Sequence, residues 1–166
     1  MRYFLILSLA LLGAACSSNQ TKEITVTEYK IEQGAYTMEG YDSVRAEKDG
    51  ADQWGMRKYV MAFLKAGPNR DQSPEERAKL QAQHMENIGR MADEGKLAVA
   101  GPFLDDGELR GIYIFNVETV EEAEALTNTD PAIQAGSLVM ELKPWFGTAA
   151  LNEVNDIHKR IAKENF

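Results

Sequence analysis

The order in which strand and helix patterns alternate is the feature that most constrains the fold of this chain. Four runs are rich in β-branched, aromatic and other apolar residues, as the strands of a half-buried sheet are. These runs are Lys58–Leu64, Leu97–Phe103, Arg110–Val117 and Leu138–Leu142. Between the second and third runs, Asp105-Asp106-Gly107 predicts a hairpin. Segments with helical periodicity separate the first run from the second and the third from the fourth.

Both intervening helices carry start and stop signals. Ser73-Pro74-Glu75-Glu76 places Ser at the N-cap, Pro at N1 and Glu at N3, which is the pattern of a capping box. We expect this helix to run to about Asp93, because Gly95 is a common stop signal. Thr119-Val120-Glu121-Glu122 repeats the pattern for a second helix, and Asp130-Pro131 begins a further helical turn that ends at Gly136.

The order β-α-β-β-α-β predicts an α+β fold of the ferredoxin-like type, an antiparallel sheet with both helices on one face. A last amphipathic helix is expected over Leu151–Glu164, with Leu151, Val154, Ile157 and Ile161 in register. A sheet rarely leaves a broad apolar face in water. The face without helices therefore needs cover from the N-terminal segment, the last helix or a second copy of the chain.

The N-terminal segment has the layout of a targeting signal. Arg2 precedes an apolar run, Phe4–Ala15, that is shorter than the roughly 20 apolar residues of a membrane-spanning helix. Leu-Gly-Ala-Ala-Cys at 12–16 resembles a bacterial lipobox, although Gly13 stands where Leu is usual. This interpretation makes Cys16, the chain's single cysteine, the acylated first residue. An ordinary signal peptide cleaved near Ala15 is the alternative.

These boundaries predict the domain organisation. We expect a signal peptide over 1–15, a lipidated and partly disordered tether over 16–55, a folded domain over 56–147 and a helical extension over 148–166. Within the tether, Glu23–Ile31 alternates polar and β-branched residues, as a strand does. The organisation predicts a lipid-anchored protein of the bacterial cell envelope with its domain in the periplasm.

The charge and the reactive residues exclude several classes of function. The chain has 18 basic and 26 acidic residues. Nucleic-acid binding depends largely on Lys and Arg that neutralise phosphates, so we expect no nucleic-acid partner. Anionic lipid headgroups are disfavoured in the same way, so membrane contact should come from the lipid anchor alone. One cysteine and two histidines predict no metal cluster, and the sequence has no phosphate loop, dinucleotide fingerprint or GxSxG elbow. We expect neither a metal nor a cofactor.

The region Arg57–Gly147 resembles the YCII-related family. Five pieces in order carry the resemblance: His84 in Gln-Ala-Gln-His-Met, Asp93-Glu94-Gly95-Lys96-Leu97, Ala100-Gly101-Pro102, Asp130-Pro131 with Ala135-Gly136, and Lys143-Pro144-Trp145. The resemblance implies a fold of the dimeric α+β barrel type, in which the sheets of a homodimer pack face to face. It also implies a His–Asp pair in a pocket, which maps to His84 and Asp130.

The residues themselves give this pair two interpretations. Imidazole titrates near neutral pH and acts as a general acid or base when a carboxylate fixes its tautomer. His84 lies on the apolar face of its helix, and Asp130 follows the second helix, so the two side chains can meet. A histidine on an apolar face is also typical of a core residue bonded to a backbone carbonyl. Asp130 before Pro131 is also a good N-cap.

We therefore carry two functional hypotheses. The first is a homodimeric enzyme that moves a proton on a small organic molecule by isomerisation, elimination or hydrolysis. The second is a non-catalytic module of the envelope that binds a small ligand or serves as a scaffold. Gly101 and Pro102 are candidate ligand contacts at a strand end, where packing is their other interpretation. His158, beside Lys159 and Arg160, is expected on a solvated face.

Overall fold

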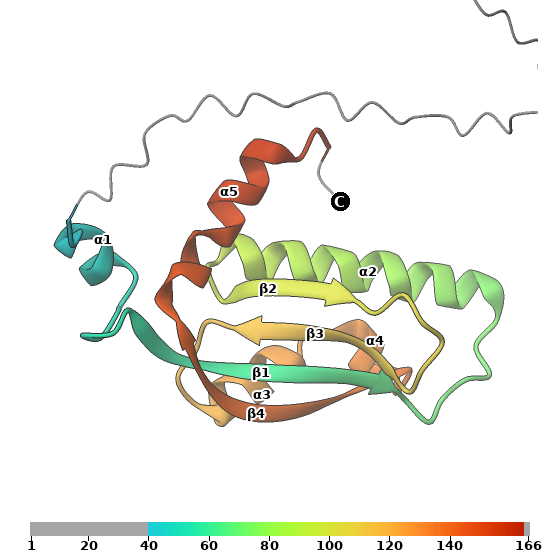
Figure 1. Cartoon of the computed structure of the whole chain (residues 1–166). Helices are drawn as coiled ribbons and strands as arrows, with labels where there is room; N and C mark the ends of the chain where they lie inside the picture. The colour runs from blue at the N-terminus through green and yellow to red at the C-terminus, as the bar shows by residue number, and fades with distance from the viewer. Residues whose placement is uncertain (1–39, 165–166) are drawn as a thin grey trace, which may run out of the picture. The chain divides into compact units, whose positions relative to one another are not determined.

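A computed structural model describes residues 40–164 (Figure 1). Signal peptide 1–15, Cys16 and the strand predicted at Glu23–Ile31 lie outside the described residues. The described elements are, in order, α1 (Ser43–Lys48), β1 (Met56–Ala66), α2 (Pro74–Asp93), β2 (Leu97–Pro102), β3 (Leu109–Phe115), α3 (Val120–Thr127), α4 (Pro131–Gln134), β4 (Leu138–Thr148), the 3₁₀ helix η1 (Ala149–Glu153) and α5 (Val154–Ile161).

The four strands form one antiparallel sheet in the order β2-β3-β1-β4. Strands β1 and β3 are central, and β2 and β4 are the edges. Together with the two helical crossovers, this order confirms the predicted ferredoxin-like α+β fold. The predicted C-terminal helix is also present, as η1 followed by α5.

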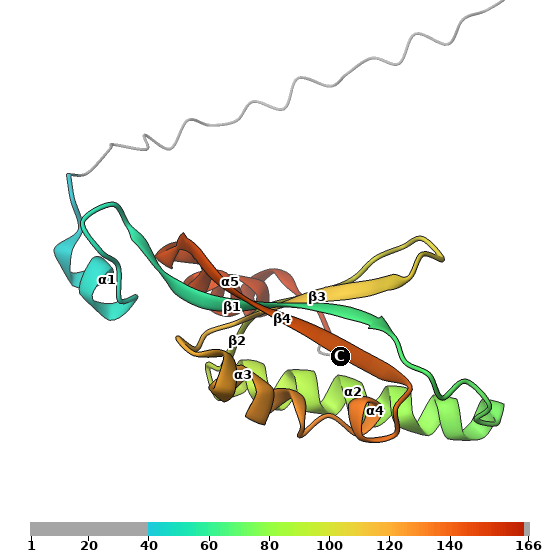
Figure 2. The same cartoon turned by 90° about the horizontal axis from the view of Figure 1, so that it is seen from below.

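The two faces of the sheet are covered differently. Figure 2 shows α2, α3 and α4 on one side of the sheet and α5 on the other. The main core lies on the helix side, where strand residues such as Val60, Tyr113 and Phe115 pack beneath Met91 of α2 and Ala123 of α3. On the other side, a smaller cluster around Tyr59 and Ile114 packs against Trp145 and Leu151. The last helical segment thus covers part of the second face.

The helix starts form largely as predicted. The Ser73 hydroxyl accepts from the Glu76 N–H at 3.2 Å, and the Ser73 N–H donates to the Glu76 carboxylate at 2.8 Å, which completes the capping box of α2. At α3 only half of the expected box forms. The Thr119 hydroxyl accepts from the Glu122 N–H, but the Glu122 carboxylate accepts from that hydroxyl instead of from the backbone.

Strand β4 is longer than the sequence pattern predicted. We expected a strand at 138–142 closed by Pro144, whereas β4 continues through this proline to Thr148. Pro144 pairs with Val60 of β1 in an edge strand, which has a hydrogen-bonded neighbour on one side only. A proline is tolerated there because its missing N–H faces away from the ladder.

Residues 40–55 contain structure that no sequence pattern predicted. The short helix α1 begins at the N-cap Asp42, whose side chain accepts from the Arg45 N–H. The carbonyl of Asp49 accepts from Arg57 at 2.9 Å and from Asn152 at 3.0 Å. These contacts attach the segment to β1 and η1. None of the described helices is long and apolar enough to cross a membrane.

Candidate functional site

The structure brings His84 of α2 and Asp130 together beneath the helices. Nδ1 of His84 lies 2.7 Å from Oδ2 of Asp130. Asp130 is fully buried and His84 is 8 % exposed. A carboxylate only accepts hydrogen bonds, so Nδ1 carries the hydrogen and donates it to Asp130. This tautomer leaves the Nε2 lone pair as the basic site of the ring.

The second oxygen of Asp130 caps a helix. Oδ1 accepts from the backbone N–H of Ala132 at 2.9 Å, and Pro131 occupies the first position of α4. Asp130 therefore contacts His84 through one carboxylate oxygen and caps α4 through the other. The cap fixes the carboxylate, and the fixed carboxylate orients the imidazole.

A polar cluster attaches the loop before Asp130 to α2. The Nη2 atom of Arg90 donates to the Asn87 side-chain oxygen at 2.8 Å and to the Thr129 hydroxyl at 2.9 Å. The Thr129 hydroxyl donates to the carbonyl of Leu126, in the last turn of α3, at 2.7 Å. Asn87 is one helical turn from His84, and Thr129 precedes Asp130. The cluster therefore holds the two halves of the His–Asp pair in register.

Tyr113 of β3 is a site residue that the sequence analysis missed. Its hydroxyl lies 3.3 Å from Nε2 of His84, and the two rings stack with centroids 6.3 Å apart. Burial raises the pKa of Tyr113 above its usual value, and the negative charge of Asp130 raises it further. In the sequence, Tyr113 stands in the continuous apolar run Ile112–Phe115 of a strand, and this pattern indicates a core residue and nothing more.

Gly101 and Pro102, the candidate ligand contacts, lie at the end of β2. Gly101 pairs with Ile112, which faces away from the helices, so the structure does not bring Gly101 into the His–Asp pair. Pro102 pairs with Gly111, where a Cβ would lie 2.5 Å from the carbonyl of Gly101. This close approach of β2 and β3 supports the packing interpretation. Ligand contact by the two residues stays a prediction.

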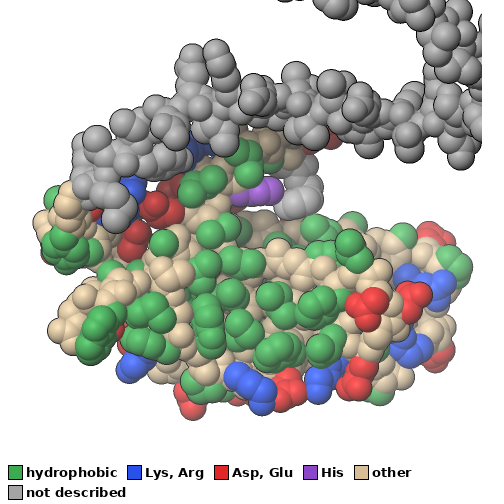
Figure 3. Space-filling model, viewed as in Figure 1, with side chains coloured by type: hydrophobic (Ala, Val, Ile, Leu, Met, Phe, Trp, Pro, Cys, Tyr) green, Lys and Arg blue, Asp and Glu red, His purple; other side chains and the backbone are tan. Residues whose placement is uncertain are grey.

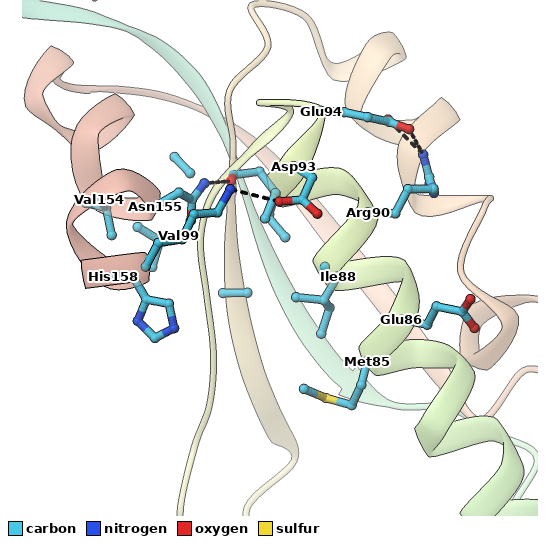
Figure 4. A pocket seen from close by; sticks show the side chains of 16 residues that line it. Met85, Glu86, Ile88, Arg90, Asp93, Glu94, Val99, Val154, Asn155 and His158 are labelled. Carbon is cyan, nitrogen blue, oxygen red and sulfur yellow. Dashed lines mark hydrogen bonds and ion pairs between the residues drawn. The ribbon is translucent and has the colours of Figure 1, made fainter. Parts of the chain in front are cut away.

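An open cleft of about 1020 Å³ lies between α2, β2 and α5 (Figure 4). Its lining includes Ile88, Val99, Val154, Asn155 and His158, and it does not include His84, Asp130 or Tyr113. Asn155 donates to the carbonyl of Leu97 at 2.7 Å, and Lys159 pairs with Asp93 at 2.9 Å, so α5 is attached to both β2 and α2. His158 is exposed, as expected, but its ring points into this cleft.

The described residues 40–164 contain no group of three His, Cys, Asp or Glu side chains that could hold a metal ion. A buried imidazole with a fixed carboxylate on one nitrogen can take up or release one proton at the other.

Comparisons with known proteins place the domain in a family. The YCII-related domain matches residues 59–146, just over half of the chain. The uncharacterized protein YjpA of Bacillus subtilis (strain 168) is 33 % identical over 64 residues, which cover 39 % of this chain and 73 % of that protein. Among solved structures, the 5-chloro-2-hydroxyhydroquinone dehydrochlorinase TftG of Burkholderia phenoliruptrix AC1100, in complex with 2,5-dihydroxybenzoquinone, aligns with a TM-score of 0.40. This alignment has 20 % identity and covers 52 % of this chain and 92 % of TftG. On the domain match and the identity to YjpA, the chain belongs to the YCII-related domain family.

Proposed function

We propose that this protein is a small-molecule enzyme in which His84 is a general acid and base and Asp130 orients it. The observation that carries the proposal is the 2.7 Å contact between Nδ1 and a fully buried carboxylate. Such a contact selects one tautomer and stabilises the imidazolium that forms when Nε2 takes a proton. A purely structural histidine needs only a neutral partner such as a backbone carbonyl.

The proposed chemistry is a single proton transfer in each direction. His84 takes a proton at Nε2 from the ligand or from water, Asp130 balances the positive charge through Nδ1–H, and Nε2 then gives a proton to another atom of the ligand or to its leaving group. Isomerisation, elimination and hydrolysis all use such a step. General acid–base catalysis typically contributes about 10²- to 10⁴-fold to a rate.

The test is a screen of small organic acids, enols, lactones and halogenated compounds in D₂O, followed by NMR. We expect deuterium incorporation or product formation from at least one compound with the wild-type chain. His84→Asn and Asp130→Asn should slow this turnover by about 10²- to 10⁴-fold. Circular dichroism and thermal melts of both variants confirm that they are folded. Turnover that survives His84→Asn unchanged would refute the proposal, as would a wild-type chain inert toward the whole set.

A second candidate function is binding without turnover, and the cleft between α2, β2 and α5 favours it. This cleft is open and has an apolar floor, as ligand sites commonly have, but its lining excludes the His–Asp pair. Compounds from the same screen that shift the NMR signals of Ile88, Val99 and Val154 without being turned over would support this function. Shifts confined to the surroundings of His84 would argue against it.

We propose that the chain acts as a homodimer joined through the sheet face opposite α2. The apolar part of this open face consists of the half-buried Met61, Phe63 and Ile112 and the 41 % exposed Val139. The ion-paired Lys65, Glu141 and Lys143 lie beside it on the same face. Figure 3 shows hydrophobic side chains gathered across it. Apolar patches of this kind commonly mark an interface.

We also propose that the chain is an envelope lipoprotein anchored through Cys16, with its domain in the periplasm. The support is the apolar run before Cys16 and the lipobox-like Leu-Gly-Ala-Ala-Cys. In a bacterial host, Cys16→Ser should abolish incorporation of radiolabelled palmitate and release the protein from the membrane fraction. A wild-type chain that takes up no label, or a Cys16→Ser variant that keeps it, contradicts the anchor.

A further inference from the structure

The Tyr113 hydroxyl occupies the one ring nitrogen through which His84 can act. Asp130 engages Nδ1 at 2.7 Å, and the Tyr113 hydroxyl faces Nε2 at 3.3 Å. Nε2 is the acceptor in this tautomer, so Tyr113 is the donor. We infer that Tyr113 is the third member of an Asp130–His84–Tyr113 chain and that a ligand exchanges protons with His84 through the Tyr113 oxygen. This inference rests on the proposed function.

The position of Tyr113 in the fold argues against a mechanism in which the ring moves away. Tyr113 is 2 % exposed on a central strand, packs edge-on against Phe115 at 5.7 Å and stacks on His84. Swinging a buried aromatic ring out of a core leaves a cavity, and removing such rings from cores typically costs about 3–5 kcal/mol. A proton can instead pass through the Tyr113 hydroxyl, which both donates and accepts, while the ring stays in place.

The relay conserves charge at Tyr113. A ligand proton moves to the Tyr113 oxygen while the hydroxyl hydrogen moves to Nε2, so the ligand gains one negative charge and the imidazole one positive charge. Tyr113 is neutral before and after. The raised pKa of Tyr113 agrees with this, because burial and Asp130 both disfavour a free tyrosinate. The 3.3 Å separation is long for a hydrogen bond, and such catalytic contacts often tighten only when a ligand is bound.

The surroundings of Tyr113 indicate where a ligand approaches and what it must carry. Toward the hairpin, the helix-facing side of β2 and β3 continues with Ala100, Pro102 and Gly111, which are all small or lack a flexible side chain. The hairpin also turns away from α2 in this direction (Figure 2). The Tyr113 hydroxyl hydrogen is donated to Nε2, so toward a ligand the Tyr113 oxygen can only accept a hydrogen bond. The ligand should therefore present an O–H or N–H group.

The first experiment needs no substrate. Nitrogen chemical shifts of the imidazoles in the full domain distinguish a free ring nitrogen from a hydrogen-bonded one. We expect Tyr113→Phe to move the Nε2 signal of His84 toward the value of an unbonded nitrogen while the Nδ1 signal stays. Tyr59→Phe is the matched control, because Tyr59 is also fully buried on a central strand but donates to the carbonyl of Thr148 on the other face of the sheet. An Nε2 signal unchanged by Tyr113→Phe, or a wild-type ring protonated at Nε2, overturns the inference.

The second experiment uses a compound that the wild-type chain turns over. A relay moves two protons together, so the rate should fall as a curved function of the D₂O fraction. Tyr113→Phe should lower kcat by about 10²- to 10⁴-fold, the range for loss of an acid–base group, whereas Tyr59→Phe should leave it unchanged. A Tyr113→Phe variant with wild-type kcat overturns the inference while His84 remains the base. An absence of turnover in every variant instead overturns the proposed function, and the chemical-shift experiment then decides the Tyr113–His84 contact by itself.

Discussion

Asp130 connects local helix structure to the candidate chemistry through a single carboxylate. Oδ1 caps α4, and Oδ2 holds His84. Asparagine has one oxygen for the cap but offers an N–H₂ group toward Nδ1. We therefore expect Asp130→Asn to keep the cap and to force His84 into the other tautomer, with hydrogen on Nε2. Imidazole nitrogen shifts report the tautomer directly.

Asp130→Ala removes both roles of the carboxylate, the cap of α4 and the contact with His84. Loss of an N-cap typically costs about 1 kcal/mol, and a buried group left without its partner costs about 1–3 kcal/mol more. Urea denaturation should show Asp130→Ala to be less stable than Asp130→Asn by about 2–4 kcal/mol. Equal stabilities would mean that the carboxylate contributes nothing as a cap.

Two glycines on neighbouring strands give a matched pair of substitutions. A Cβ on Gly111 would lie 2.5 Å from the carbonyl of Gly101, which is backbone and cannot move without disturbing the ladder, whereas a Cβ on Gly101 meets nothing within 4 Å. Overpacking of this kind typically costs about 1–3 kcal/mol. We expect Gly111→Ala to lower the free energy of unfolding by about that amount and Gly101→Ala to change it little, as measured by chemical denaturation. A larger loss for Gly101→Ala would contradict the register of β2 and β3.

At the scale of the element, α2 contains a glycine that weakens it. Gly89 is exposed within this 20-residue helix, and a Cβ there would meet nothing within 4 Å. Glycine in a helix interior is about 0.8–1.0 kcal/mol less favourable than alanine. Gly89→Ala should therefore raise the free energy of unfolding by up to about 1 kcal/mol in urea denaturation. A loss of stability would indicate that Gly89 allows a close approach within the cleft.

The β1–β4 ladder carries a charge network that makes stability depend on pH. The Glu141 carboxylate lies between the ammonium groups of Lys143 and Lys65, which lower its pKa from 4.5 to about 2. A lowered pKa means that the stabilisation is complete above pH 4.5 and is lost as the pH falls toward 2. Glu141→Gln should flatten the fall in melting temperature across this window. Glu124→Gln on the exposed surface of α3 is the control and should follow the wild-type curve; a Glu141→Gln curve parallel to wild type contradicts the network.

The elements differ in how far the sequence predicts them. The strand–helix order was predictable because each crossover has its own period, cap and glycine stop, as Ser73 and Gly95 show for α2. The extension of β4 past Pro144 was not, because tolerance of a proline depends on which strand forms the edge. Helix α1 has six residues and no buried face, so its stability depends on tertiary contacts such as Arg45 with Glu153.

The site was predictable only as far as its local signals reach. The resemblance to the YCII-related family singled out His84 and Asp130, whereas the residues alone also fitted a core histidine and an N-cap. Tyr113 did not stand out, because the apolar run Ile112–Phe115 accounts for it fully as a core residue. Its contact with Nε2 of His84 forms because α2 packs on the sheet. The spacing of residues in the sequence does not predict how close these two side chains lie.

At the scale of the molecule, α5 leaves part of the open face uncovered. Leu151 and Trp145 close the end of the face near Tyr59 and Ile114. Met61 packs against this cluster, and Phe63 and Ile112 continue the face beyond it. The described residues therefore cover one end of the open face and leave the other end uncovered. A second copy of the chain would bury the most apolar surface at this uncovered end.

The uncovered part of the open face predicts how a charge placed there would affect dimerisation. Ile112 lies on central strand β3 and pairs with Phe63 and Gly101, neither of which is charged. A glutamate at this position stays in contact with water in a monomer but becomes a buried, unpaired charge in a face-to-face dimer, and such a burial costs several kcal/mol. At about 1.4 kcal/mol per tenfold change, Ile112→Glu should weaken dimerisation at least about 100-fold in sedimentation velocity. Val44→Glu, at a position of α1 that is 78 % exposed, should leave the dimer intact. A wild-type domain that sediments as a monomer at tens of micromolar, or an Ile112→Glu variant that remains dimeric, would rule out packing through this face.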